Sequence, residues 1–95
     1  MAKRVIATKA PNLDLPVDMK RLGEFVRFKR TSLDITIESA ASLCGVSKQS
    51  LNNIELGVDS VKLVTLFKVT KQLGISLWFD SQNTEGTKEI DDEWL

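Results

Sequence analysis

Apolar residues recur at helical spacing early in the chain. From about Val17 to Thr31 this spacing predicts one helix whose outer side is largely basic. Its apolar side is expected to consist of Met19, Leu22, Phe25, Val26 and Phe28. Residues 1–16 show no helical period and contain both prolines of the chain, so they are expected to form a flexible basic arm. The alternative is that Lys3, Arg4 and Lys9 touch phosphate or a minor groove.

The stretch from Ile35 to Glu55 predicts two short helices joined by a tight turn. Thr36 and Ser47 are suited to cap the two helices, and Gly45 stands where the first one should stop. Gly57 stands where a left-handed C-cap belongs after the second helix. The side chains expected to face inward are Ala40, Ala41 and Leu43, then Leu51 and Ile54.

A fourth helix is expected between Ser60, as its cap, and Gly74. Its predicted core side consists of Leu63, Leu66, Phe67, Val69 and Leu73. After Gly74 the pattern alternates, which is typical of a strand with Ile75, Leu77 and Phe79 on one face. A lone strand needs a partner from a second copy, so these three residues are predicted to mediate dimerisation. The alternative is an extended segment lying across its own helices.

The predicted fold class is therefore mainly all-α. We expect a compact bundle of four to five helices with a helix-turn-helix, and a C-terminal β-strand that pairs across a homodimer. The predicted divisions are the arm at 1–16, a helix-turn-helix domain at 17–80 with its strand at 75–80, and an acidic, disordered tail at 81–95.

Composition narrows the possible functions. The net charge is zero, but residues 1–79 carry twelve Lys/Arg against seven Asp/Glu (+5), and residues 80–95 carry one against six (−5). A basic body suits nucleic acid. The chain has no histidine and a single cysteine, Cys44, which lies in an apolar pattern and is expected to be a reduced core residue. We therefore expect no enzyme activity, no catalytic residues, no metal and no cofactor. No long apolar run predicts a membrane span, and a cytoplasmic, nucleoid-associated protein is expected.

The second short helix presents polar side chains that suit DNA. Lysine can bind guanine O6 and N7, and glutamine or asparagine can pair with adenine. The residues predicted to contact DNA are Thr36, Ser47, Lys48, Gln49, Ser50, Asn52 and Asn53. The alternative is a polar helix exposed only to water.

A set of motifs runs in register from about Leu22 to Leu77: Arg27-x-x-Arg30, Thr36, Ala41, Gly45-Val46-Ser47, Ile54-Glu55-x-Gly57 and Leu73-Gly74-Ile75-Ser76-Leu77. Through these residues the chain resembles the Xre/Cro-C1 class of helix-turn-helix repressors. The resemblance implies a structural ion pair between Arg30 and Glu55. It also implies double-stranded DNA as partner, bound by a dimer at a palindromic operator with half-sites ~34–36 Å apart. Ile37 departs from the class, which usually has a phosphate-binding glutamine there.

Within the class, the chain is most similar to HipB-type antitoxins, the partners of HipA-type kinase toxins. The similarity rests on Lys48-Gln49, on the strand-like segment after the fourth helix and on an acidic tail that contains Trp94. It implies a repressor of a toxin–antitoxin operon, with Trp94 as a toxin contact. Two alternatives stay open: a free-standing phage or host repressor, and a protein-interaction module that has lost DNA binding. No small-molecule ligand is expected.

Overall fold

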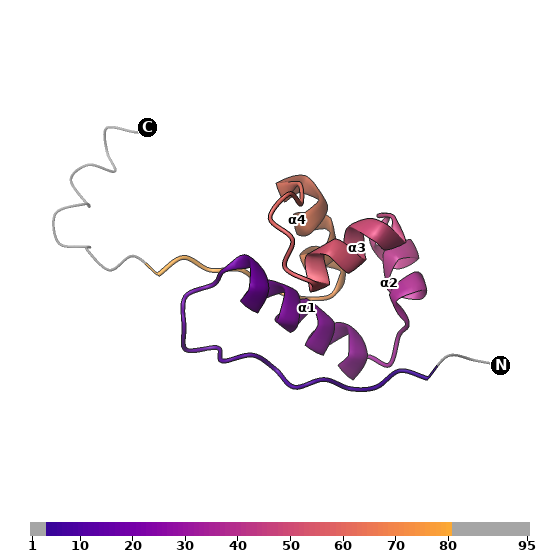
Figure 1. The fold of residues 1–95 in the computed structure, drawn as a ribbon, viewed down its shortest axis with the longest axis horizontal. Helices are drawn as coiled ribbons and strands as arrows, with labels where there is room; N and C mark the ends of the chain where they lie inside the picture. The colour runs from indigo at the N-terminus through magenta and orange to yellow at the C-terminus, as the bar shows by residue number, and fades with distance from the viewer. Residues whose placement is uncertain (1–3, 81–95) are drawn as a thin grey trace, which may run out of the picture.

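The computed structural model describes residues 4–80, which contain four helices (Figure 1). Their bounds are α1 Met19–Ser32, α2 Ile37–Cys44, α3 Lys48–Glu55 and α4 Leu63–Gln72. Helix α3 packs against each of the other three, so it lies at the centre of the bundle. The all-α helix-turn-helix prediction is confirmed.

Of the three predicted N-terminal helix caps, two are confirmed and one is wrong. Thr36 and Ser47 cap α2 and α3 as expected, accepting hydrogen bonds from the backbone nitrogens of Ser39 (3.2 Å) and Ser50 (3.0 Å). Helix α1 is capped by Asp18. The prediction for α4 was wrong, because Lys62 rather than Ser60 is its N-cap residue and makes no side-chain capping bond.

The core is one apolar cluster to which all four helices contribute. Its buried members are Leu22, Val26, Ala40, Ala41, Cys44, Leu51, Ile54, Leu66, Val69, Leu73 and Ile75. Three residues predicted to face inward are instead exposed: Leu43, Leu63 and Phe67.

The exposure of Leu43 and of Phe67 follows from which face of each helix is buried. In α2 the buried face is formed by Ala40, Ala41 and Cys44, and Leu43 falls on the flank of that face. In α4 the buried face includes Thr70, whose hydroxyl donates to the Phe67 carbonyl oxygen at 3.2 Å. Thr70 thus occupies a core position that the apolar pattern did not indicate, and Phe67, on the flank of that face, is exposed.

Residues 75–80 follow α4 without helix or strand, and no strand pairing occurs within residues 4–80. Ile75 is buried in the core of its own chain, whereas Leu77 and Phe79 are exposed. The expected alternation therefore breaks after Ile75 within a single chain. Pairing with a second copy stays a prediction.

The N-terminal segment runs back along α1 (Figure 1). The Thr8 nitrogen donates to the Thr31 hydroxyl of α1 at 3.2 Å. Thr31 is buried and its hydroxyl also donates to the Arg27 carbonyl oxygen at 2.9 Å. This contact joins the predicted arm to the end of α1, and the sequence pattern did not indicate it.

Candidate nucleic-acid interface

Helices α2 and α3 are joined by a turn that fixes their relative direction. Gly45 ends α2 with φ +72°, a left-handed conformation that favours glycine. The Val46 nitrogen then donates to the Ala41 carbonyl oxygen at 3.0 Å. Ser47 follows as the cap of α3, so three consecutive residues complete the turn between the two helices.

The outer face of α3 carries the side chains predicted to contact DNA. Lys48 and Gln49 are exposed at its start, and Asn52 and Asn53 are half-buried one turn later. Ser47 is exposed, and Ser50 is half-buried with its hydroxyl 2.9 Å from that of Ser47. The structure thus places these six residues around the polar surface of one short helix, with Lys48 and Asn52 lining one groove and Ser50 and Asn53 another.

The polar groups of this face bind one another in the free protein. Gln49 Nε2 donates to Asn53 Oδ1 at 3.0 Å, and Lys48 Nζ lies 2.9 Å from Glu38 Oε2 of α2. The Lys48 and Glu38 side chains are 58% and 40% exposed, and an ion pair in such a position stabilises a fold by only ~0–1 kcal/mol. These contacts can be exchanged for contacts to a ligand at small cost.

The inner face of α3 fixes the helix to the bundle. Leu51 and Ile54 are completely buried, and Glu55 is 4% exposed. Gly23 of α1 lies against the last turn of α3, and a Cβ added there would be 2.9 Å from the Glu55 carbonyl oxygen and still closer to that of Ile54. Only glycine permits this approach of the two helices.

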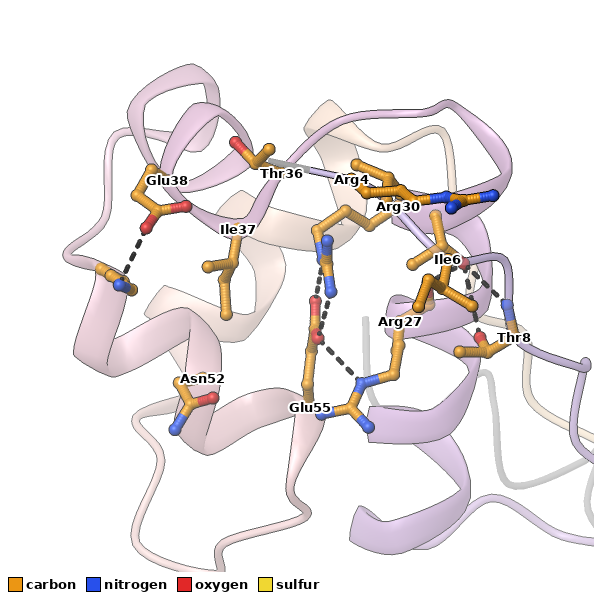
Figure 2. Close-up of a pocket in the computed structure, with 13 residues that line it drawn as sticks. Arg4, Ile6, Thr8, Arg27, Arg30, Thr36, Ile37, Glu38, Asn52 and Glu55 are labelled. Atoms are coloured by element: carbon orange, nitrogen blue, oxygen red, sulfur yellow. Dashed lines mark hydrogen bonds and ion pairs between the residues drawn. The ribbon is translucent and has the colours of Figure 1, made fainter. Parts of the chain in front are cut away.

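Glu55 is held by two arginines of α1 (Figure 2). Arg30 Nε and Nη2 donate to the two carboxylate oxygens at 2.6 and 3.0 Å, and Arg27 Nε donates at 3.2 Å. Arg30 Nη1 also donates to the Ile35 carbonyl oxygen at 2.9 Å, ahead of α2. Arg30 therefore links α1, the approach to α2 and the end of α3.

Beside this network lies an open groove of about 390 Å³, called the arm groove below. Figure 2 shows Ile6 and Thr8 of the N-terminal segment on one side of it and Ile37 and Asn52 on the other, with the Arg30–Glu55 contact between them. Thr36, Glu38, Lys48 and Arg4 also line it. The groove thus adjoins the outer face of α3.

Ile37 is half-buried and packs against the core cluster. Its side chain has no hydrogen-bonding group, so it cannot bind a phosphate near the start of α2, where the Thr36 hydroxyl and backbone N–H groups are possible donors. The Thr36 hydroxyl also lies 3.1 Å from that of Ser39.

The remaining predicted sites lie elsewhere. Leu77 and Phe79 are exposed beyond α4, far along the chain from α3, and Trp94 lies outside the described residues. Sequence reasoning missed Glu38 and Thr8. Glu38 stands ten residues before Lys48, a separation that indicates contact only once the turn geometry is known.

Cys44 faces the core rather than a site. It is 5% exposed, and burial raises the pKa of its thiol. Among residues 4–80 no group of three or more histidine, cysteine or acidic side chains is placed to hold a metal ion. Within the same range, no helix is long and apolar enough to cross a membrane.

Comparison with known proteins agrees with this geometry. A protein of Haemophilus influenzae named as an uncharacterized HTH-type transcriptional regulator is 35% identical over 60 residues, which cover 63% of this chain and 59% of that relative. The chain thus spans about three fifths of the relative's length. The family model for the helix-turn-helix matches residues 26–77, more than half of the chain. This chain belongs to the helix-turn-helix family.

Proposed function

We propose that the protein is a sequence-specific DNA-binding regulator of transcription, in which α3 enters the major groove. The observation that carries the proposal is the division of α3 into two faces. Leu51, Ile54 and Glu55 fix it to the bundle, while Lys48 and Gln49 project from its first turn. The first turn is the part of a recognition helix that reaches base edges.

Each polar residue then has a role consistent with its position. Lys48 and Gln49 contact base edges, with Asn52 and Asn53 extending the same face. Ser47, Ser50 and Thr36 contact phosphates at the helix starts. The name of the similar regulator in Haemophilus influenzae supports a role in transcription.

The outer face of a single α3 is small, so specific DNA affinity requires two half-sites. The proposal therefore includes a homodimer on a palindromic operator. Leu77 and Phe79 support it, since both are apolar and exposed, at 42% and 103%. The Ile75 side chain is buried in the core of its own chain, so the proposal places the apolar contacts across the dimer on Leu77 and Phe79.

The finer proposal is that the regulator is the antitoxin of a HipA-type kinase operon, with Trp94 binding the toxin. It rests on the resemblance alone, because Trp94 lies outside the described residues. Co-purification of a kinase encoded beside this chain, lost on Trp94→Ala, would support it. Repression without any such partner would favour a free-standing repressor.

DNA binding is tested by enrichment from a random duplex library. The wild-type chain should enrich one near-palindromic site, and Gln49→Ala should lower affinity for that site at least about fivefold, since a bidentate base contact contributes ~1–3 kcal/mol of discrimination. Gln72→Ala, an exposed glutamine at the end of α4, is the matched control and should bind as wild type. Failure of the wild-type chain to enrich any site would refute the proposal and leave the protein-interaction module.

A further inference from the structure

The arm groove places a cation of the N-terminal segment near the proposed DNA-binding face. Arg4 lines the groove together with Thr36, Lys48 and Asn52. Arg4 is the first described residue of the chain and is exposed. The groove therefore joins a segment outside the helix-turn-helix to the residues proposed to bind DNA (Figure 2).

The position of Arg4 is restricted by the contact of Thr8 with Thr31. Thr8 donates its backbone N–H to the Thr31 hydroxyl, and the two hydroxyls lie 3.4 Å apart. Arg4 stands four positions before Thr8, a separation that spans at most ~14 Å when the chain is extended. Val5, between them, is half-buried. Arg4 therefore stays near the end of α1 and the start of α2.

The charges of the groove favour an anion. Its lining contains four cations, Arg4, Arg27, Arg30 and Lys48, against the two carboxylates Glu38 and Glu55, which leaves +2. Arg27 and Arg30 bind Glu55, and Lys48 binds Glu38. Within residues 4–80 Arg4 forms no ion pair, so its guanidinium can bind an anion without giving up a carboxylate partner among these residues.

We propose that Arg4 binds a phosphate of the DNA backbone beside the major groove that α3 enters. A guanidinium presents a fork of N–H donors that matches phosphate oxygens. Arg4 would thereby supply from the arm the phosphate contact that the apolar side chain of Ile37 does not make. The inference rests on the proposed DNA binding and adds a residue outside the matched helix-turn-helix.

The test is the salt dependence of binding to the duplex that the wild-type chain enriches. Loss of one phosphate contact lowers the slope of log affinity against log salt by ~0.9 for each bound chain. Arg4→Ala should show this decrease together with weaker binding, whereas Arg4→Lys, which keeps the charge, should restore most of the slope.

Two further variants distinguish a phosphate contact of Arg4 from a general effect of net charge. Lys9→Ala removes one exposed cation from the same segment, and Lys9 lines a different cavity beside Glu24, so its slope should equal that of wild type. Thr31→Val removes the anchor of the arm. The effect of Arg4→Ala should therefore shrink in the Thr31→Val background.

The outcomes are distinct. A wild-type chain that enriches no duplex refutes the proposed function and this inference with it. A wild-type chain that binds, with equal slopes for wild type and Arg4→Ala, refutes only the role of Arg4. Equal decreases for Arg4→Ala and Lys9→Ala also refute it, because the effect would then be one of net charge.

Discussion

Gly23 of α1 lies so close to the Ile54 carbonyl oxygen of α3 that no methyl group fits between them. The contact is made by backbone, which cannot rotate out of the way as a side chain can. It sets the distance between the helix that carries both arginines and the helix that carries the proposed DNA-binding side chains.

Gly23→Ala should therefore move α1 away from α3. Overpacking of this kind costs ~1–3 kcal/mol, to be measured as a lower free energy of unfolding in urea. Glu24→Ala, at the next and exposed position of α1, is the control and should unfold near the wild-type midpoint. Equal midpoints for Gly23→Ala and wild type would show that the helices can separate without loss.

The two arginines that bind Glu55 should differ in importance. The Arg30 side chain is 12% exposed and that of Glu55 0%, so Arg30→Ala leaves a buried carboxylate short of its main partner and should cost ~3–5 kcal/mol. Arg27 is 41% exposed and donates one bond at 3.2 Å, so Arg27→Ala should cost less than ~1 kcal/mol. Urea unfolding of both variants measures the difference, and equal losses would contradict this ranking.

Glu38 should restrain DNA binding in the wild-type chain. It binds Lys48 and places a negative charge beside the proposed phosphate path. Glu38→Gln should raise DNA affinity about two- to fivefold, the equivalent of one exposed ion pair. The same change should slightly lower the melting temperature, because an acid in the first turn stabilises a helix. Asp59→Asn, a charge removal at an exposed position outside the arm groove, is the control.

Cys44 should make stability depend on alkaline pH. Because burial raises the pKa of the Cys44 thiol, the unfolded chain loses this proton first as pH rises. The contribution of the protonated Cys44 thiol to the free energy of unfolding is fully present below ~8.5, the pKa of the thiol in the unfolded chain. It is lost as pH rises from there toward the higher pKa of the thiol in the folded chain. Urea unfolding at pH 7.5 and 10 should show this loss. For each chain, the loss is the decrease in the free energy of unfolding between pH 7.5 and pH 10. This decrease should be smaller in Cys44→Ala than in wild type, and equal decreases would exclude the thiol as the cause.

The dimer is best tested at residues that a single chain leaves exposed. Leu77→Asp with Phe79→Asp should give a folded monomer with weaker operator binding, measured by sedimentation and by titration of the enriched duplex. Ile75→Asp is unsuitable, because Ile75 is 8% exposed in the core and the change would unfold the chain. A double variant that still sediments as the wild-type dimer would rule out pairing through this segment.

Local chemistry made the centre of the fold predictable. Thr36 and Ser47 occupy cap positions, and Gly45 and Gly57 adopt the left-handed conformation that their places in the pattern required. These features depend on neighbouring residues alone. For that reason the helix-turn-helix and the shared face of Lys48 and Gln49 followed from the sequence.

What could not be predicted depends on contacts between distant segments. Which face of α4 is buried depends on the neighbours that cover Thr70. The position of the N-terminal arm depends on a hydrogen bond between residues 23 positions apart. The contact of Glu38 with Lys48 likewise requires the angle between two helices. Periodicity carries no information of this kind.

The central position of α3 has a consequence for how target choice can change. The helix that contacts all the others is also the one proposed to face DNA, but its inward and outward residues do not overlap. Exchanging Lys48 or Gln49 alters no buried contact. A new operator preference can therefore arise at these positions without loss of the fold, so libraries randomised there should yield stable proteins with altered recognition.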